Sequence, residues 1–239
     1  MAPKDPARTL KALGYGTPPA LAPLTYPGRP ITTPALLLGD ELHDLTIQDA
    51  LTDVLKDRTP VLAVGSNASP AQIAHKLTRL SLPVRVPMIP VRTRGIGIGC
   101  SAHIGRNGYV AAAPYPDPGA ALTLVVTWLD EVQLKAVDAT ELPNYRRVAV
   151  PDAPVPGLQL YVSEYGVLTD PATGGAPRPG GGDQAALLTA LLRRSPALLA
   201  LLGPTPDDWV RRAAASPAAR EEGTRLLRET GYQTAHWPR

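Results

Sequence analysis

An apolar run that ends in Gly-Ser-Asn and leads directly into a helix start, at residues 59–72, constrains the fold more than any other stretch of the chain. Residues 61–64 form a compact apolar run that predicts a strand. Ser69 stands at an N-cap position, Pro70 suits the first helical turn, and Gln72 has the spacing of a capping box. We therefore expect a strand that passes through a tight loop into a helix.

The loop Gly65-Ser66-Asn67 between this strand and this helix is a candidate anion-binding site. The first N–H groups of a helix have no partner within the helix, and the positive end of the helix dipole lies beside them. Such a corner can bind a carboxylate or a developing oxyanion. A tight turn that binds no ligand explains the same residues and stays open as an alternative at this point.

Composition and charge narrow the class of protein. The chain has 239 residues with 24 basic and 21 acidic side chains, which suits one large domain or a core with appendages. No dense basic run with interleaved aromatic residues occurs, which argues against nucleic-acid binding. The longest apolar runs, such as residues 122–129, are too short to span a bilayer, and the first residues lack the apolar core of a signal peptide. A single cysteine, Cys100, excludes an internal disulfide and a cysteine-based zinc cluster. We expect a soluble, cytoplasmic protein with no membrane partner.

The pattern along the chain predicts an α+β fold in three parts. Residues 1–58 form a Pro-rich N-terminal extension with a short helix at 46–55, residues 59–195 form the core, and residues 196–239 form a helical tail. Strands are expected at 84–91, 109–113, 122–129, 145–150 and 158–165.

Turns and caps separate these elements. The stretch at 114–119, Pro-Tyr-Pro-Asp-Pro-Gly, predicts a turn between two strands. Asp130, with Gln133 in the reciprocal position, predicts a helix that reaches about residue 136. The helical end of the chain carries its own cap candidates: Asp183, Thr205 and Ser216.

Glu141 is the strongest candidate for a catalytic carboxylate. It stands between the end of a helix and Pro143, just before a strand that starts at Tyr145. A Glu followed four residues later by Tyr-Arg at a strand start is unusual for a merely solvated acid. A surface Glu in a helix-to-strand turn is the alternative.

Taken together, four short motifs resemble the gamma-glutamylcyclotransferase family. They are Val64-Gly65-Ser66-Asn67, Gly-Tyr-Val-Ala-Ala at 108–112, Val-Val-Thr-Trp at 125–128, and Val-Asp-Ala-Thr-Glu at 137–141 with Tyr145. They occur in the family's order, and the resemblance covers roughly residues 59–170.

The resemblance implies a small, mixed, mostly antiparallel β-barrel or roll with flanking helices, formed by the core. It implies that Glu141 is the general acid/base and that Val64, Gly65, Ser66, Asn67 and Tyr145 bind the substrate. The reaction is an intramolecular aminolysis of a γ-glutamyl amide or peptide that releases 5-oxoproline. It needs no metal and no other cofactor, and the implied partner is a small molecule that carries a γ-glutamyl group.

One position departs from the family's pattern. Val64 stands where the family has Tyr, which removes an aromatic hydroxyl from the edge of the loop. The departure is compatible with a different substrate or with loss of the original activity. A non-catalytic binding or interaction module on the same fold is therefore the rival hypothesis. The γ-glutamyl compound and the oligomeric state stay open.

Other motifs suggest a dinucleotide site or a Cys–His catalytic pair, but the evidence for each is weaker. The glycines of Gly95-Ile-Gly-Ile-Gly99 do not open a helix, so a strand with one bare face explains them better than a dinucleotide site. Cys100 and His103 lack a third orienting group that would make them a nucleophile and base. Tyr161 and Tyr165 are expected in the core, with one of them a candidate for the pocket wall, and Trp209 and Trp237 are expected to anchor the tail.

Overall fold

A computed structural model of the chain describes all residues except 1–4, 47, 49–53, 151–152, 230–232 and 239. The strands, in chain order, are β1 (Ala35–Leu38), β2 (Glu41–Asp44), β3 (Thr59–Ala63), β4 (Arg85–Ile104), β5 (Val110–Leu129), β6 (Tyr145–Ala149), β7 (Gln159–Ser163), β8 (Val167–Asp170), β9 (Ala176–Pro177) and β10 (Gln233–Ala235). The α-helices are α2 (Pro70–Arg79), α3 (Glu131–Glu141), α4 (Gln184–Arg194), α5 (Pro196–Leu202), α6 (Pro206–Ala215) and α7 (Pro217–Glu229). The short 3-10 helices are η1 (Pro6–Arg8), η2 (Pro23–Thr25), η3 (Ser66–Ala68) and η4 (Pro171–Thr173). The helix expected at 46–55 falls largely on residues outside the described part of the chain.

The strands form one open, mostly antiparallel sheet, so the α+β class is confirmed and the closed barrel is wrong. The hydrogen-bonded order is β10-β8-β4-β5-β3-β7-β6, and β1 and β2 extend it beside the first part of β4. β3 runs parallel to β7 (Leu62 opposite Leu160) and antiparallel to β5. The two ends of the order, β10 and β6, are not joined by any pairing among the described residues.

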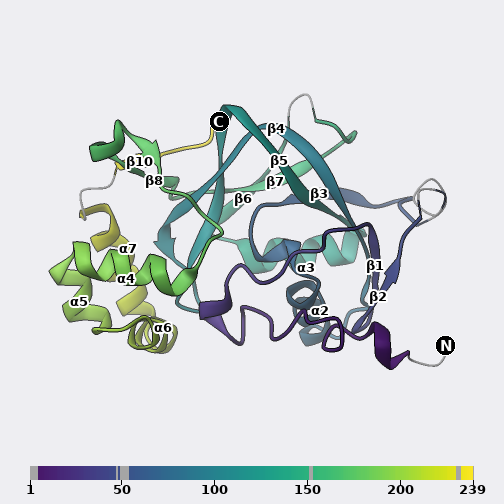
Figure 1. Cartoon of the computed structure of the whole chain (residues 1–239), viewed down its shortest axis with the longest axis horizontal. Helices are drawn as coiled ribbons and strands as arrows, with labels where there is room; N and C mark the ends of the chain where they lie inside the picture. Colours follow the sequence, from purple (N-terminus) through teal and green to yellow (C-terminus); the bar gives the residue numbers. More distant parts are fainter. Residues whose placement is uncertain (1–4, 47, 49–53, 151–152, 230–232, 239) are drawn as a thin grey trace.

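β4 and β5 form a long hairpin in the middle of the sheet (Figure 1). The turn expected at 114–119 is wrong, because β5 continues through these residues and Pro114 and Pro116 pair with Ile98 and Ile96. In an antiparallel ladder only alternate residues direct their N–H groups at a given partner strand, so a proline can occupy a position that donates no bond. The register shift between Arg94 and Ile96 absorbs the extra residues as an irregularity of the strand.

Two helices on one side of the sheet position the loop at 65–67 and Glu141. α2 begins at the expected place after Ser69, but the Ser69 side chain makes no cap bond. Gln72 instead accepts a hydrogen bond from the backbone N–H of Ala20 (3.1 Å), which fastens the N-terminal extension to this helix. Asp130 and Gln133 form the expected capping box of α3, which extends beyond residue 136 to end at Glu141.

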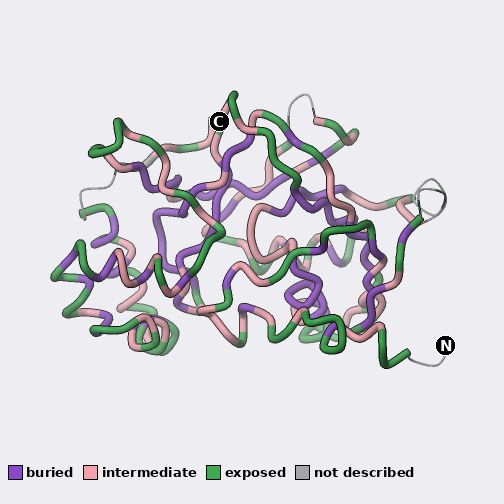
Figure 2. The backbone as a smooth tube through the Cα atoms, viewed as in Figure 1, coloured by how far each residue is buried: buried purple, intermediate pink, exposed green. Residues whose placement is uncertain are grey.

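The buried side chains form three clusters. Figure 2 shows where the buried residues lie along the backbone. One cluster lies between the sheet, α2 and the N-terminal extension, and includes Tyr26, Ile73 and Leu77. A second lies on other residues of the sheet, around Val126 and Leu160. The third lies between the C-terminal helices, the last residues of β4 and the first residue of β5.

The C-terminal helices α4 to α7 pack together at one end of the sheet (Figure 1). The expected caps are confirmed: Asp183 accepts from the N–H of Ala186, Thr205 from Asp208 and Ser216 from Ala219. No single helix in the described part of the chain has the length and apolar composition to cross a membrane, although the bent pair α4 and α5 passes that test by length and composition.

Candidate functional site

The loop between β3 and α2 presents unpaired backbone N–H groups. β3 ends at Ala63, and residues 66–68 form the 3-10 turn η3 before α2 begins. Within the described residues, the N–H groups of Gly65, Ser66 and Asn67 donate no hydrogen bond. These groups precede or begin a helical turn, where no intrahelical acceptor exists, so they are available to a ligand.

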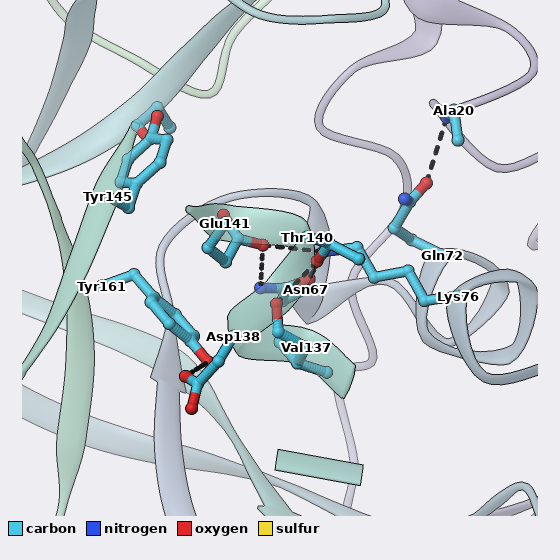
Figure 3. A network of polar contacts seen from close by, with 11 residues as sticks. Ala20, Asn67, Gln72, Lys76, Val137, Asp138, Thr140, Glu141, Tyr145 and Tyr161 are labelled. Atoms are coloured by element: carbon cyan, nitrogen blue, oxygen red, sulfur yellow. Dashed lines mark hydrogen bonds and ion pairs between the residues drawn. The ribbon is translucent and has the colours of Figure 1, made fainter. Parts of the chain in front are cut away.

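Glu141, the last residue of α3, points at this loop (Figure 3). Its Oε1 accepts a hydrogen bond from the Asn67 side-chain amide (3.1 Å) and forms an ion pair with Lys76 Nζ at 2.7 Å. Lys76 also donates to Asn67 Oδ1 at 2.8 Å, which closes a three-residue network. The Glu141 side chain is only 16% exposed, and its second oxygen, Oε2, has no partner in the described part of the chain.

A second network fixes the helix turn that carries Glu141. Asp138, one turn before Glu141, accepts from Tyr161 Oη at 2.6 Å and from Arg147 Nε and Nη2 at 2.8 and 3.0 Å. Arg147 lies on β6 and Tyr161 on β7, so the carboxylate ties α3 to both strands. Burial raises the pKa of Asp138, but the bonds from Arg147 and Tyr161 outweigh it and lower that pKa overall.

Two tyrosine hydroxyls bind the backbone of one residue, Ala112, on the other wall of the site. Tyr26 Oη accepts from the N–H of Ala112 (2.7 Å), and Tyr145 Oη donates to the carbonyl of Ala112 (3.2 Å). A Cβ on Gly65 would lie only 2.3 Å from Tyr26 Oη, so this glycine lets the hydroxyl contact the loop. Val64 supplies no hydroxyl, and the N-terminal extension brings one to the loop instead.

His103 adds a buried, neutral imidazole. Its Nδ1 lies 2.6 Å from Ser101 Oγ, which in turn lies 2.7 Å from Ser163 Oγ. The ring stacks on Tyr165 and meets Tyr145 edge-on. Burial lowers the pKa of His103 to about 4, although the Glu141 carboxylate opposes this shift.

The loop, Glu141, Lys76, the two tyrosines and His103 line one cavity of about 1090 Å³, and Asp138, Arg147, Ser101 and Ser163 support it from behind. This volume slightly exceeds the roughly 300–1,000 Å³ of small-molecule sites. The cavity brings together every residue that the sequence predicts for the site, namely Val64, Gly65, Ser66, Asn67, Glu141 and Tyr145. Tyr161 and Tyr165 line it as well. Cys100 is not part of it: its thiol donates to the carbonyl of Pro179, and burial raises its pKa to about 11, which disfavours a nucleophilic thiolate.

Sequence reasoning missed three contributors to the site: Lys76, Tyr26 and the arginines of α7. Lys76 lies about two helical turns after the loop, on α2. A lysine between the apolar Ile73 and Leu77 gives little indication in the sequence of a role in the site. Tyr26 lies in a Pro-rich stretch without periodicity, and the arginines lie on an element outside the resemblance.

The described residues contain no group of three or more His, Cys, Asp or Glu side chains that could hold a metal ion. The comparisons with known proteins give no relative: no family model matches the chain, and neither a curated protein nor a solved structure matches it.

Proposed function

We propose that the chain is a cyclotransferase that acts on γ-glutamyl amides or peptides and releases 5-oxoproline, with Glu141 as the general acid/base. The observation that carries the proposal is the contact between Glu141 and Asn67, which joins a largely buried carboxylate to a loop of unpaired N–H groups inside one cavity. The resemblance in the sequence and this geometry support the same reaction independently.

The chemistry needs one proton carrier and one well-held substrate. The α-amino nitrogen of the γ-glutamyl unit attacks the γ-carbonyl carbon, a five-membered ring closes, and the original amide C–N bond breaks. The attacking nitrogen loses a proton and the leaving nitrogen gains one, so a single carboxylate within reach of both can transfer it. Oε2 of Glu141 is the oxygen left free for this transfer.

The neighbours of Glu141 suit this role. Asn67 and Lys76 both bind Oε1, so they fix the carboxylate while Oε2 reacts. The N–H groups of the loop can hold a substrate carboxylate or the oxygen of the γ-carbonyl as negative charge develops on it. Because the attack is intramolecular, holding the substrate in a reactive conformation contributes a large part of the rate.

The test is 5-oxoproline release by the full-length protein and by Glu141→Gln across a panel of γ-glutamyl dipeptides and γ-glutamyl amines. Gln keeps the shape and the bond to Asn67 but cannot carry the proton, so kcat should fall by about 10²- to 10⁴-fold while the fold, checked by circular dichroism, is kept. Glu131→Gln is the matched control, because Glu131 begins the same helix but its side chain is 80% exposed and pairs with Lys135 on the helix surface.

Release of 5-oxoproline that Glu131→Gln keeps and Glu141→Gln loses supports the enzyme. If the wild-type protein binds γ-glutamyl compounds by calorimetry but releases no 5-oxoproline from any of them, the rival hypothesis of a non-catalytic binding module replaces it. If Glu141→Gln retains full turnover, Glu141 is not the proton carrier.

A further inference from the structure

The cavity wall carries far more positive than negative charge. Its six cationic side chains are Lys76, Arg79, Arg106, Arg220, Arg225 and Arg228, against the two carboxylates Glu141 and Glu221. The whole chain has a formal charge of only +3, so positive charge is concentrated at this site. Such a concentration raises the local density of anions and favours their binding.

Half of these cations are already engaged. Lys76 pairs with Glu141 at 2.7 Å, and Arg225 pairs with Glu222 and Glu229 on its own helix. The Arg220 guanidinium donates to the carbonyls of Ala213 and Ala214 at the end of α6. Lys76 and Arg225 are therefore balanced by carboxylates, and Arg220 is held in place by backbone carbonyls at the end of α6.

Arg79, Arg106 and Arg228 have no acidic partner in the part of the chain that the structure describes. All three are exposed, and all three line the cavity. Arg228 lies over the ring of Tyr165, 5.5 Å from its centroid, which orients the guanidinium without neutralising it.

Packing of α7 on the end of β4 places one arginine on each side of a fixed contact, and both line the cavity. Thr224 Oγ1 accepts a hydrogen bond from the N–H of Ile104 (3.1 Å), which fixes the helix against the end of the strand. Arg228 lies one helical turn beyond Thr224, and Arg106 lies two residues beyond Ile104 in the turn between β4 and β5. Tyr165, under Arg228, stacks on His103, whose ring centroid is 4.8 Å away, so this edge is continuous with the interior of the site.

We propose that Arg106 and Arg228 form a subsite for the leaving portion of the substrate and that this portion is acidic, with two carboxylates preferred over one and one over none. The proposal rests on the proposed function, because it assumes that the γ-glutamyl unit occupies the Glu141 end of the cavity. The guanidinium groups can each bind a carboxylate through paired N–H donors. Arg106 lies within the region of family resemblance and Arg228 outside it, so α7 adds to the selection of the substrate.

The experiment compares three substrates that differ in the charge of the leaving portion: γ-glutamyl-ethylamide, γ-glutamyl-glycine and γ-glutamyl-glutamate. In the wild-type protein, kcat/KM should rise about fivefold to tenfold with each added carboxylate, mainly through KM, and the rise should shrink as salt is added. In Arg106→Gln/Arg228→Gln the three values should converge, because γ-glutamyl-glycine and γ-glutamyl-glutamate lose their advantage over the ethylamide. Arg228→Lys should restore part of the preference, and Arg211→Gln, an exposed arginine of α6 outside the cavity, should leave all three values unchanged.

Equal kcat/KM for the three compounds in the wild-type protein would overturn the subsite and leave the cyclotransferase in place. Absence of 5-oxoproline from all three would overturn the cyclotransferase, and the subsite is then decided by dissociation constants measured on Glu141→Gln. Affinity that rises with carboxylate number, and that the double variant loses, supports the subsite. Affinity that is independent of charge contradicts it.

Discussion

At the scale of the residue, His103 shows how burial in this site sets chemistry. The side chain is 2% exposed, and Tyr145 and Tyr165 cover its ring while Ser101 bonds Nδ1. Removal from water disfavours the imidazolium, so the pKa falls from 6.5 to about 4 in spite of the Glu141 carboxylate. His103 is therefore neutral at neutral pH and can accept or donate a hydrogen bond in the cavity without adding to its positive charge.

A pH-dependent stability follows from this shift. Between pH 6.5 and about 4 the unfolded chain binds a proton at His103 that the folded chain does not, so the free energy of unfolding falls as the pH falls through this window. A shift of this size corresponds to about 3 kcal/mol when fully developed. His103→Phe keeps an aromatic ring against Tyr165 and cannot titrate, so its urea unfolding should lose less stability between these pH values than that of the wild-type protein. A difference between the two proteins that stays constant from pH 7 to pH 4 would contradict the shift.

At the scale of the element, two backbones approach each other so closely that only glycine fits. The N–H of Gly180 donates to the carbonyl of Ile98, and a Cβ on Gly180 would lie 2.1 Å from the carbonyl oxygen of Gly99. This contact fastens the segment before α4 to β4. It lies along the glycines at 95–99, where a strand with one bare face was expected. Gly180→Ala must separate the two segments, and we expect it to cost roughly 2–3 kcal/mol.

Thermal unfolding checks this cost. For a chain of this length, roughly 2–3 kcal/mol lowers Tm by roughly 5–10 °C. Gly182→Ala is the control, because a Cβ at Gly182 meets nothing within 4 Å and the residue is exposed. Equal Tm values for the two variants would show that the backbone contact contributes nothing to stability.

Patterns in the sequence predict local structure, such as caps and strands, but not the contacts between elements that are far apart in the chain. The caps at Asp130 and Thr205 and the strand before Gly65 depend on neighbouring residues, so the sequence predicts them. The contact of Glu141 with Asn67 was anticipated only through the order of the motifs. Bonds such as Lys76 to Glu141, 65 residues apart, and Tyr26 to Ala112, 86 apart, depend on how elements pack, and no periodicity encodes them. The closed barrel was wrongly predicted for the same reason, because closure of a sheet depends on whether its two end strands pair.

At the scale of the whole molecule, the C-terminal helices and the sheet share one apolar cluster. Leu188, Leu198 and Trp209 of the helices pack with Ile104 of β4 and Val110 of β5. Trp209 is fully buried, and its Nε1 donates to the carbonyl of Gly108 (2.9 Å) in the turn between these strands. Removing the helices would expose this cluster and the strand end that carries His103, so the helices and the site depend on each other.

We therefore expect the helices and the sheet to unfold in one cooperative transition, although the chain is longer than most two-state domains of under about 150 residues. Trp128→Phe/Trp237→Phe leaves Trp209 as the single tryptophan, so its fluorescence reports the helices while far-UV circular dichroism reports all secondary structure. Both signals should give the same urea midpoint and the same m-value, because a shared core couples the surface that each part exposes. Trp209→Phe/Trp237→Phe leaves Trp128 in β5 as the single tryptophan. Both of its signals should give a lower urea midpoint than the wild-type protein, because the variant loses the bond from Trp209 to Gly108. Two separate transitions would mean that the helices fold as an independent unit, and that the subsite of Arg228 could then be lost without loss of the Glu141 site.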